Sequence, residues 1–128
     1  LHPARIQQSG VHLRTVARLS RRMARTLFHQ MVKFGPKLEL RQILLGRIAD
    51  IGSDLFALAA TCVYAQKLLN EGDSADKVLA LTDDFAVQAL ARIGTNFQGV
   101  AHNSDESGYA LAQQVVAGEH TWIEQGIL

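Results

Sequence analysis

Residues 38–70 read LELRQILLGRIADIGSDLFALAATCVYAQKLLN, and their pattern predicts one long α-helix. Apolar residues recur every three or four positions, the spacing that places them on one face of a helix. This stripe contains Leu40, Ile43, Leu44, Ile48, Ile51, Leu55, Leu58, Cys62, Ala65 and Leu69. At about 1.5 Å per residue the helix is roughly 50 Å long, a length typical of helical bundles. We expect the helix to end at Glu71-Gly72.

The sequence on both sides of this helix predicts three more. The first helix ends at Gly35-Pro36, because proline cannot continue the helical hydrogen-bond ladder. Asp73 or Ser74 caps the third, which reaches about Gly99, and the fourth begins after Ser104. The apolar stripe of the fourth helix contains Tyr109, Ala112, Val115, Val116, Trp122 and Ile123. Short connections between long amphipathic helices predict an all-α fold, an antiparallel up-and-down four-helix bundle that forms a single domain over residues 1–128.

Charge is distributed very unevenly along the chain. Up to Arg47, ten Lys and Arg stand against the single Glu39, a net charge of +9, and from Ile48 onward three Lys and Arg stand against eleven Asp and Glu, a net charge of −8. The net charge of +1 is therefore the sum of a strongly basic N-terminal part and a strongly acidic remainder. Six of the cations lie on one side of the first helix, next to its apolar stripe: Arg14, Arg18, Arg21, Arg22, Arg25 and Lys33.

Four roles fit this basic face. It can pair with the acidic helices of the same bundle, or dock another domain or subunit, since arginine outnumbers lysine six to two through residue 38 and favours fixed, bidentate contacts. It can also lie on an anionic membrane surface, as basic amphipathic helices do. Nucleic acid is the least favoured partner, because the chain has no recognisable helix-turn-helix spacing.

A second polar set lies on or beside the apolar face of the long central helix. Arg47 and Asp50 are three residues apart, and Asp54 follows one turn later. Arg92, in the middle of the third helix, can meet a carboxylate from across the bundle. We interpret these four residues as a structural ion network that fixes the register of the helices. A polar binding site inside the bundle is the alternative.

Other common sites are not indicated by the sequence. The longest apolar run, residues 55–65, has 11 residues, whereas a membrane-spanning helix needs about 20. The single Cys62 lies in this run and is expected to be a buried, unreactive thiol. No phosphate-binding loop or nucleophile elbow occurs, so we expect no catalytic site. No metal site is expected either, because the histidines lack ligand spacing: His2, His12, His29, His102 and His120.

Several stretches resemble one enzyme family. LGRIADIGSDLFA at residues 45–57 resembles the L-x-R-[IL]-A-D-x-x-x-D-L-[FY]-A segment near the C-terminus of very-long-chain acyl-CoA dehydrogenases. Asp83 with ALARI at residues 89–93 is similar to the D-x5-A-x-A-R-I stretch of that family. His2-Pro3 with Ser9-Gly10 fits its H-P…S-G entry. The resemblance covers essentially the whole chain, although the first helix is richer in arginine than the family pattern.

The resemblance implies a specific setting for this chain. Those flavoenzymes desaturate fatty acyl-CoA: a glutamate abstracts the α proton and FAD takes the β hydride. Both the base and FAD lie in an upstream core, so the resemblance implies that this chain is a non-catalytic C-terminal domain that binds no cofactor itself. It implies partners in the upstream core and in a second subunit of a homodimer, with membrane association assigned to this region. No catalytic residue carries over, and none of Glu39, Glu71, Glu106, Glu119 and Glu124 is a candidate base.

A different class of protein stays open from the sequence alone. The alternative is a stand-alone helical interaction or ligand-binding module, such as the effector domain of a regulator. For the enzyme we expect a cytoplasmic or mitochondrial-matrix type of compartment, with peripheral membrane attachment as a further option and no nucleic-acid partner.

Overall fold

The structure, a computed structural model, describes residues 3–126, with side chains described from Gly10 onward. It contains four α-helices: α1 (Pro3–Phe34), α2 (Gln42–Asn70), α3 (Ala75–Ala101) and α4 (Asp105–Val116). Two short 3₁₀ helices, η1 (Gly35–Leu40) and η2 (Thr121–Ile123), complete the order of elements. No strand occurs within the described residues, and the predicted all-α class is confirmed.

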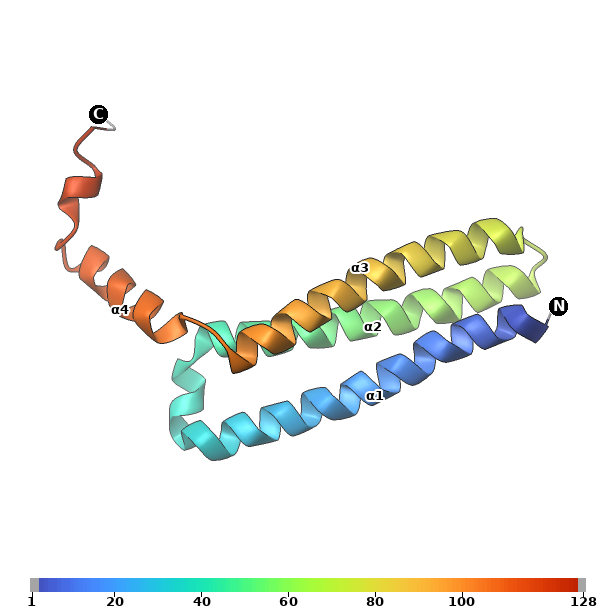
Figure 1. Ribbon diagram of the computed structural model, residues 1–128, viewed down its shortest axis with the longest axis horizontal. Helices are drawn as coiled ribbons and strands as arrows, with labels where there is room; N and C mark the ends of the chain where they lie inside the picture. Colours follow the sequence, from blue (N-terminus) through green and yellow to red (C-terminus); the bar gives the residue numbers. More distant parts are fainter. Residues whose placement is uncertain (1–2, 127–128) are drawn as a thin grey trace.

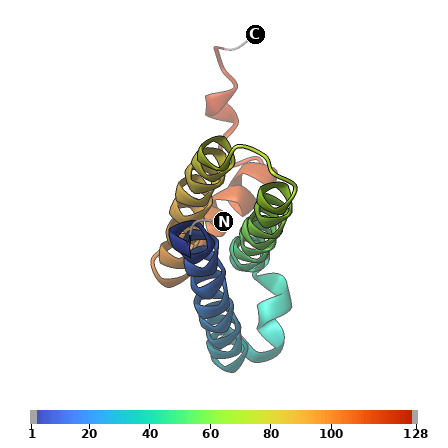
Figure 2. The same ribbon diagram turned by 90° about the vertical axis from the view of Figure 1, so that its right-hand side faces the viewer.

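The three long helices lie side by side and alternate in direction (Figure 1). Figure 2, which looks along them, shows α1, α2 and α3 at the corners of a triangle. α2 packs against both neighbours, whereas α1 and α3 touch each other much less. The helix that we predicted from residues 38–70 is therefore the central element of the fold.

The core follows the predicted stripe of α2 for most of its length. Eight of the ten predicted positions are buried: Leu44, Ile48, Ile51, Leu55, Leu58, Cys62, Ala65 and Leu69. Ile51 and Leu58 are completely inaccessible to solvent. Ile51 packs in one cluster with Leu19 of α1 and with Ile93 and Phe97 of α3, so one α2 side chain joins all three helices.

The start of α2 differs from the prediction. The helix begins at Gln42 and not at Leu38, because Gly35–Leu40 form a 3₁₀ helix with Pro36 in its first turn. Arg41, with φ −94° and ψ 64°, then breaks the helical path. A 3₁₀ helix has about three residues per turn, which shifts the phase of the stripe. Leu40 is therefore exposed, at 73%. Ile43 lies within α2 but about 100° around the helix from Leu44, beside the buried stripe, and it is 51% exposed.

The turn between α2 and α3 agrees with the prediction. Gly72 has φ +90°, a conformation that side-chain-bearing residues rarely adopt. Its N–H donates to the Leu69 carbonyl at 3.2 Å, and the Asp73 N–H donates to the Leu68 carbonyl at 3.1 Å. These bonds satisfy the last carbonyls of α2 and let the chain reverse within a few residues.

The four-helix bundle is not what the structure has, because α4 does not join the other three helices. It projects away from them (Figure 1), and none of its residues is buried. It is also shorter than predicted: it ends at Val116, and Gly118 follows with φ +82°. The chain then continues through η2, so that residues 105–126 form an extension that we call the C-terminal arm. The described fold is a bundle of three long helices that carries this arm at one end.

Candidate docking surfaces

The outward side of α1 combines cations with apolar side chains. Arg14, Arg18, Arg21 and Arg25 recur every three or four residues and are all exposed. Beside them lie exposed apolar residues, of which Phe28 is 62% and Val32 71% accessible. We call this surface the outer face of α1, and it comprises Leu13, Arg14, Arg18, Arg21, Arg25, Phe28, Met31 and Val32.

The arginines of this face are not engaged by the bundle itself. In the described part of the chain, no carboxylate lies within 4.0 Å of Arg14, Arg18, Arg21 or Arg25. Arg22 points elsewhere, and its guanidinium lies 4.1 Å from the centre of the Phe97 ring of α3. Lys33 lies near the ring of Phe34 at the end of α1. Pairing with the acidic helices, one of the four roles considered, therefore does not account for these four arginines.

Among the described side chains, a histidine of α1 contacts an acidic residue of α3. His12 Nε2 lies 2.8 Å from Asp83 Oδ1, and both side chains are partly shielded from solvent. The same carboxylate adds to the effect of burial on Cys62: burial, and secondarily the charge of Asp83, raises the pKa of the Cys62 thiol. This thiol is only 1% exposed. It is therefore held in the protonated, unreactive form.

The four residues interpreted as one ion network do not form a network: only Arg92 and Asp54 pair with each other. Arg92 of α3 donates hydrogen bonds to Asp54 of α2: its Nε and Nη2 lie 3.2 and 2.9 Å from Oδ1. The hydrogen bond to Asp54 raises the pKa of Arg92 above its already high value. Arg47 instead reaches Asp105 of α4, with Nη2 2.8 Å from Oδ1. Asp50 is exposed and makes no ion pair with any described residue.

We expect Asp54→Asn to lower the thermal unfolding midpoint by a few degrees. The substitution keeps the size of the side chain but removes the charge that Arg92 contacts in a bidentate geometry, which links α2 to α3. Asp50→Asn is the matched control, because it lies one turn away on the same helix and has no such partner. Scanning calorimetry of both variants measures the difference, and equal midpoints would mean that the Asp54–Arg92 pair is solvated and idle.

The root of α4 is held by polar contacts that sequence spacing did not predict. Besides the Arg47–Asp105 pair, Arg41 Nη2 lies 3.1 Å from Glu106 Oε1. The Asn103 side chain bridges α3 and α4. Its Nδ2 donates to the Gly99 carbonyl at 2.8 Å, and its Oδ1 accepts from the Asp105 N–H at 3.1 Å. These contacts set the direction in which α4 leaves the bundle.

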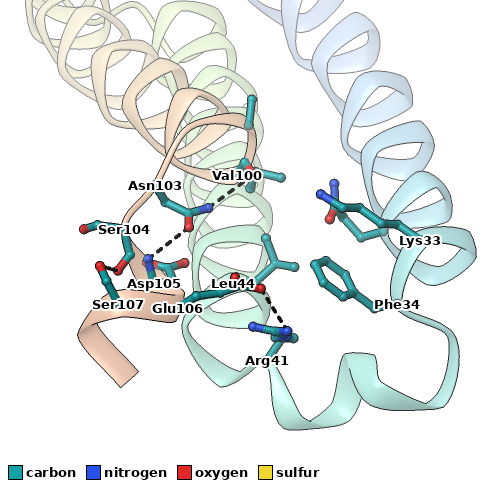
Figure 3. A pocket seen from close by; sticks show the side chains of 12 residues that line it. Lys33, Phe34, Arg41, Leu44, Val100, Asn103, Ser104, Asp105, Glu106 and Ser107 are labelled. Atoms are coloured by element: carbon teal, nitrogen blue, oxygen red, sulfur yellow. Dashed lines mark hydrogen bonds and ion pairs between the residues drawn. The ribbon is translucent and has the colours of Figure 1, made fainter. Parts of the chain in front are cut away.

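A groove of about 520 Å³ lies beside this root (Figure 3). Phe34 of α1, Leu44 of α2 and Val100 of α3 provide its larger apolar side chains, and Lys33 adds a cation from α1. On the α4 side, Asn103 to Ser107 provide polar groups. Two charged groups of the groove are paired, Arg41 with Glu106 and Asp105 with Arg47, although Arg47 Nε and Asp105 Oδ2 are buried without a hydrogen-bond partner among the described residues. The groove therefore suits a structural joint better than a site for an anionic ligand.

The C-terminal arm exposes a continuous set of apolar side chains. On α4, residues at intervals of three and four share one side, and Val116 is 89% exposed. Trp122, which is 65% exposed, lies beyond the helix, where its Nε1 donates to His120 Nδ1 at 3.2 Å. His120 in turn contacts Gln114 at 2.9 Å, so the end of the arm is folded onto α4. The exposed apolar residues of the arm are Tyr109, Leu111, Val115, Val116, Trp122 and Ile123.

Two kinds of site are not found in the part of the chain that the structure covers. No group of three or more His, Cys, Asp or Glu side chains among these residues could hold a metal ion. His2 lies outside the described residues. None of the described helices has both the length and the apolar character needed to cross a bilayer.

The chain is similar to known proteins over most of its length. The family model "ACAD9/ACADV, C-terminal domain" matches residues 6–121. Relatives described as probable acyl-CoA dehydrogenase FadE10, from Mycobacterium bovis and Mycobacterium tuberculosis, are 40% identical over 120 residues. The match covers 93% of this chain but 18% of each relative, so the chain corresponds to less than a fifth of their length. No solved structure matches.

The family match extends over all three long helices and into the arm, and the similarity to FadE10 covers almost the whole chain. The chain therefore belongs to the ACAD9/ACADV C-terminal domain family of acyl-CoA dehydrogenases.

Proposed function

We propose that this chain is the non-catalytic C-terminal domain of an FAD-dependent long-chain acyl-CoA dehydrogenase, and that it serves in subunit docking and assembly. The observation that carries the proposal is the outer face of α1, where four exposed arginines without carboxylate partners in the described chain adjoin exposed Phe28 and Val32. Interfaces are enriched in arginine and aromatic residues. The partners in this proposal are the upstream core of the same chain and a second subunit of a homodimer.

FAD belongs to the upstream core in this proposal, where it accepts hydride from the acyl chain. We propose that this chain does not hold the cofactor itself. At the root of α4, Arg41 is paired with Glu106 and Arg47 with Asp105, so neither arginine is available to a pyrophosphate. We therefore assign no step of the flavin chemistry to this chain. A stand-alone regulatory module is not favoured, because the relatives that this chain resembles bear the name of a dehydrogenase.

Charge reversal tests the docking role in the full-length enzyme. Arg18, Arg21 and Arg25 are changed together to Glu; Arg22 is left intact because it stacks on Phe97 within the bundle. We expect dimer assembly, measured by analytical ultracentrifugation, to weaken at least about tenfold, as expected when complementary charges at an interface become like charges. The control changes three exposed lysines outside this face to Glu with the same change in net charge: Lys37, Lys67 and Lys77. Equal assembly of both triple variants would contradict the docking role.

A membrane-surface role is the second candidate, and it is favoured by the same combination of arginines and exposed Phe28 and Met31. Co-sedimentation with vesicles that contain phosphatidylserine separates it from docking. Binding that is lost at high salt and in the arginine triple variant supports membrane contact. Absence of binding at low salt would remove it. In either case we propose a cytoplasmic or mitochondrial-matrix type of compartment.

A further inference from the structure

We infer that the C-terminal arm of one copy docks on the outer face of α1 of a second copy. The inference rests on the proposed docking role of this face and names the segment that occupies it. The first observation is the uncovered apolar surface of the arm. Tyr109, Ala112 and Val116 follow the helical spacing on α4, with Leu111 and Val115 beside them, and none of the five is buried. Helices with such a stripe gain most of their stability from covering it.

The arm does not lie on its own bundle in the structure. It leaves from the C-terminal end of α3, beside the start of α2, and points away from α1 (Figure 1). The Arg47–Asp105 and Arg41–Glu106 pairs hold its first turn in that direction. The end of the arm is nevertheless ordered by contacts of its own, from Gln114 to His120 and from His120 to Trp122. A preformed helix that points away from its own bundle is suited to contact another copy.

Charge complementarity favours the outer face of α1 as the surface that the arm contacts. The sequence after Arg92 contains no Lys or Arg, and the arm carries Asp105, Glu106, Glu119 and Glu124. The first two acids are used at the root, whereas Glu119 and Glu124 make no ion pair with a described residue. The outer face of α1 offers the reverse: arginines without carboxylate partners beside an exposed apolar strip, and no acid between Gly10 and Phe34.

Such an exchange also closes on itself. Each copy has one arm and one outer face, so two copies related by a two-fold axis satisfy both at once. The apolar residues of the arm then cover Leu13, Phe28, Met31 and Val32, and the free glutamates of the arm lie among the arginines. No surface of either kind is left over for a third copy, so the exchange produces a dimer and not a filament.

Four exposed valines, one chosen from each helix, allow a direct test. Val116 of the arm is changed to Cys in one preparation, and Val32 of α1, Val63 of α2 or Val87 of α3 in another; these three are 71%, 63% and 67% exposed. The full-length protein is used, and the two preparations are mixed under mild oxidation, so that any disulfide between the two variants joins different copies. The native Cys62 is retained, since it is buried.

We expect the Val116→Cys and Val32→Cys proteins to form a mixed disulfide dimer. Its yield should exceed that of the Val63→Cys and Val87→Cys mixtures at least about tenfold, because docking raises the effective concentration of the two thiols. Glu119→Lys with Glu124→Lys in the Val116→Cys protein should reduce the yield. Equal yields for the three targets, or no disulfide with Val32→Cys, would overturn the exchange.

The two proposals fail differently. If Arg18, Arg21 and Arg25 reversal weakens assembly but no disulfide joins Val116→Cys to Val32→Cys, the outer face of α1 docks something other than the arm, and only this inference is wrong. If the reversal leaves assembly unchanged, the docking function itself is wrong.

Discussion

Ile51→Ala should lower the free energy of unfolding by about 3 kcal/mol, within the range found for large-to-small changes in well-packed cores. Ile51 is completely inaccessible to solvent and lies in one cluster with Leu19, Ile93 and Phe97. Truncation of its side chain therefore leaves a cavity where all three long helices meet, and no single helix can move to fill it without losing contact with another. A domain of this size is stabilised by about 5–15 kcal/mol, so this loss is a large share of the total.

The matched control is Ile43→Ala, which removes the same atoms from the same helix. Ile43 is 51% exposed, and we expect a change of less than about 0.5 kcal/mol. Urea unfolding followed by far-UV circular dichroism measures both variants, with the slope of the transition checked for constancy. Similar losses at the two positions would contradict the observed phase of α2, which turns Ile51 inward and Ile43 outward.

The contrast between Ile51 and Ile43 also marks what the sequence could predict. The period of the apolar residues is a local property, and it located the core face of α2 correctly from Leu44 to Leu69. The stripe was wrong at its N-terminal end: Ile43 lies beside it on α2, and Leu40 is displaced because Pro36 and the 3₁₀ turn after it change the number of residues per turn. A pattern read with a constant period of 3.6 does not register such a change.

The placement of α4 could not be predicted for a different reason. Its apolar stripe was recognised, and a stripe indicates that a helix has a face to cover. It does not indicate what covers that face. In the structure no residue of α4 is buried, although a four-helix bundle was the natural expectation from four amphipathic stretches. The same ambiguity applies to the arginines of α1, which the sequence placed on one face but could not assign to a partner.

The ion pairs show how spacing along a helix can mislead. Arg47 and Asp50 are suitably spaced neighbours on α2, yet Arg47 binds Asp105, which lies 58 residues away. The Arg92–Asp54 pair, also between helices, was within reach of the sequence because both residues lie near the middle of long, antiparallel neighbours. Asp105 lies in the first turn of α4, whose position depends on the tertiary structure.

Gly99 leaves room for the side chain of Arg47, and its replacement should have the second large effect that we expect. A Cβ atom at Gly99 would lie 2.6 Å from Arg47 Nη1 and 3.1 Å from its Cδ and Cζ, so the side chain of Arg47 passes directly over this glycine. In Gly99→Ala the guanidinium has to move away from the added Cβ, and we expect this shift to take Nη2 away from Asp105 Oδ1. The loss of a charged hydrogen bond costs about 1.5–3 kcal/mol, and the helix propensity of alanine returns about 1 kcal/mol.

Gly94→Ala, on the same helix, provides the comparison. No atom lies within 4 Å of a Cβ added at Gly94. That variant should gain about 1 kcal/mol from helix propensity alone, so the two alanines should differ by about 2 kcal/mol in urea unfolding. In an Arg47→Ala background, Gly99→Ala should be as favourable as Gly94→Ala, since the obstructing side chain is gone.

The fluorescence anisotropy of Trp122, the single tryptophan of the chain, reports on the arm directly. It should fall in Gly99→Ala as the root of α4 loosens and stay unchanged in Gly94→Ala. If Gly99→Ala were as stable as Gly94→Ala, with the anisotropy of Trp122 unaltered, Arg47 would not be what orients the arm.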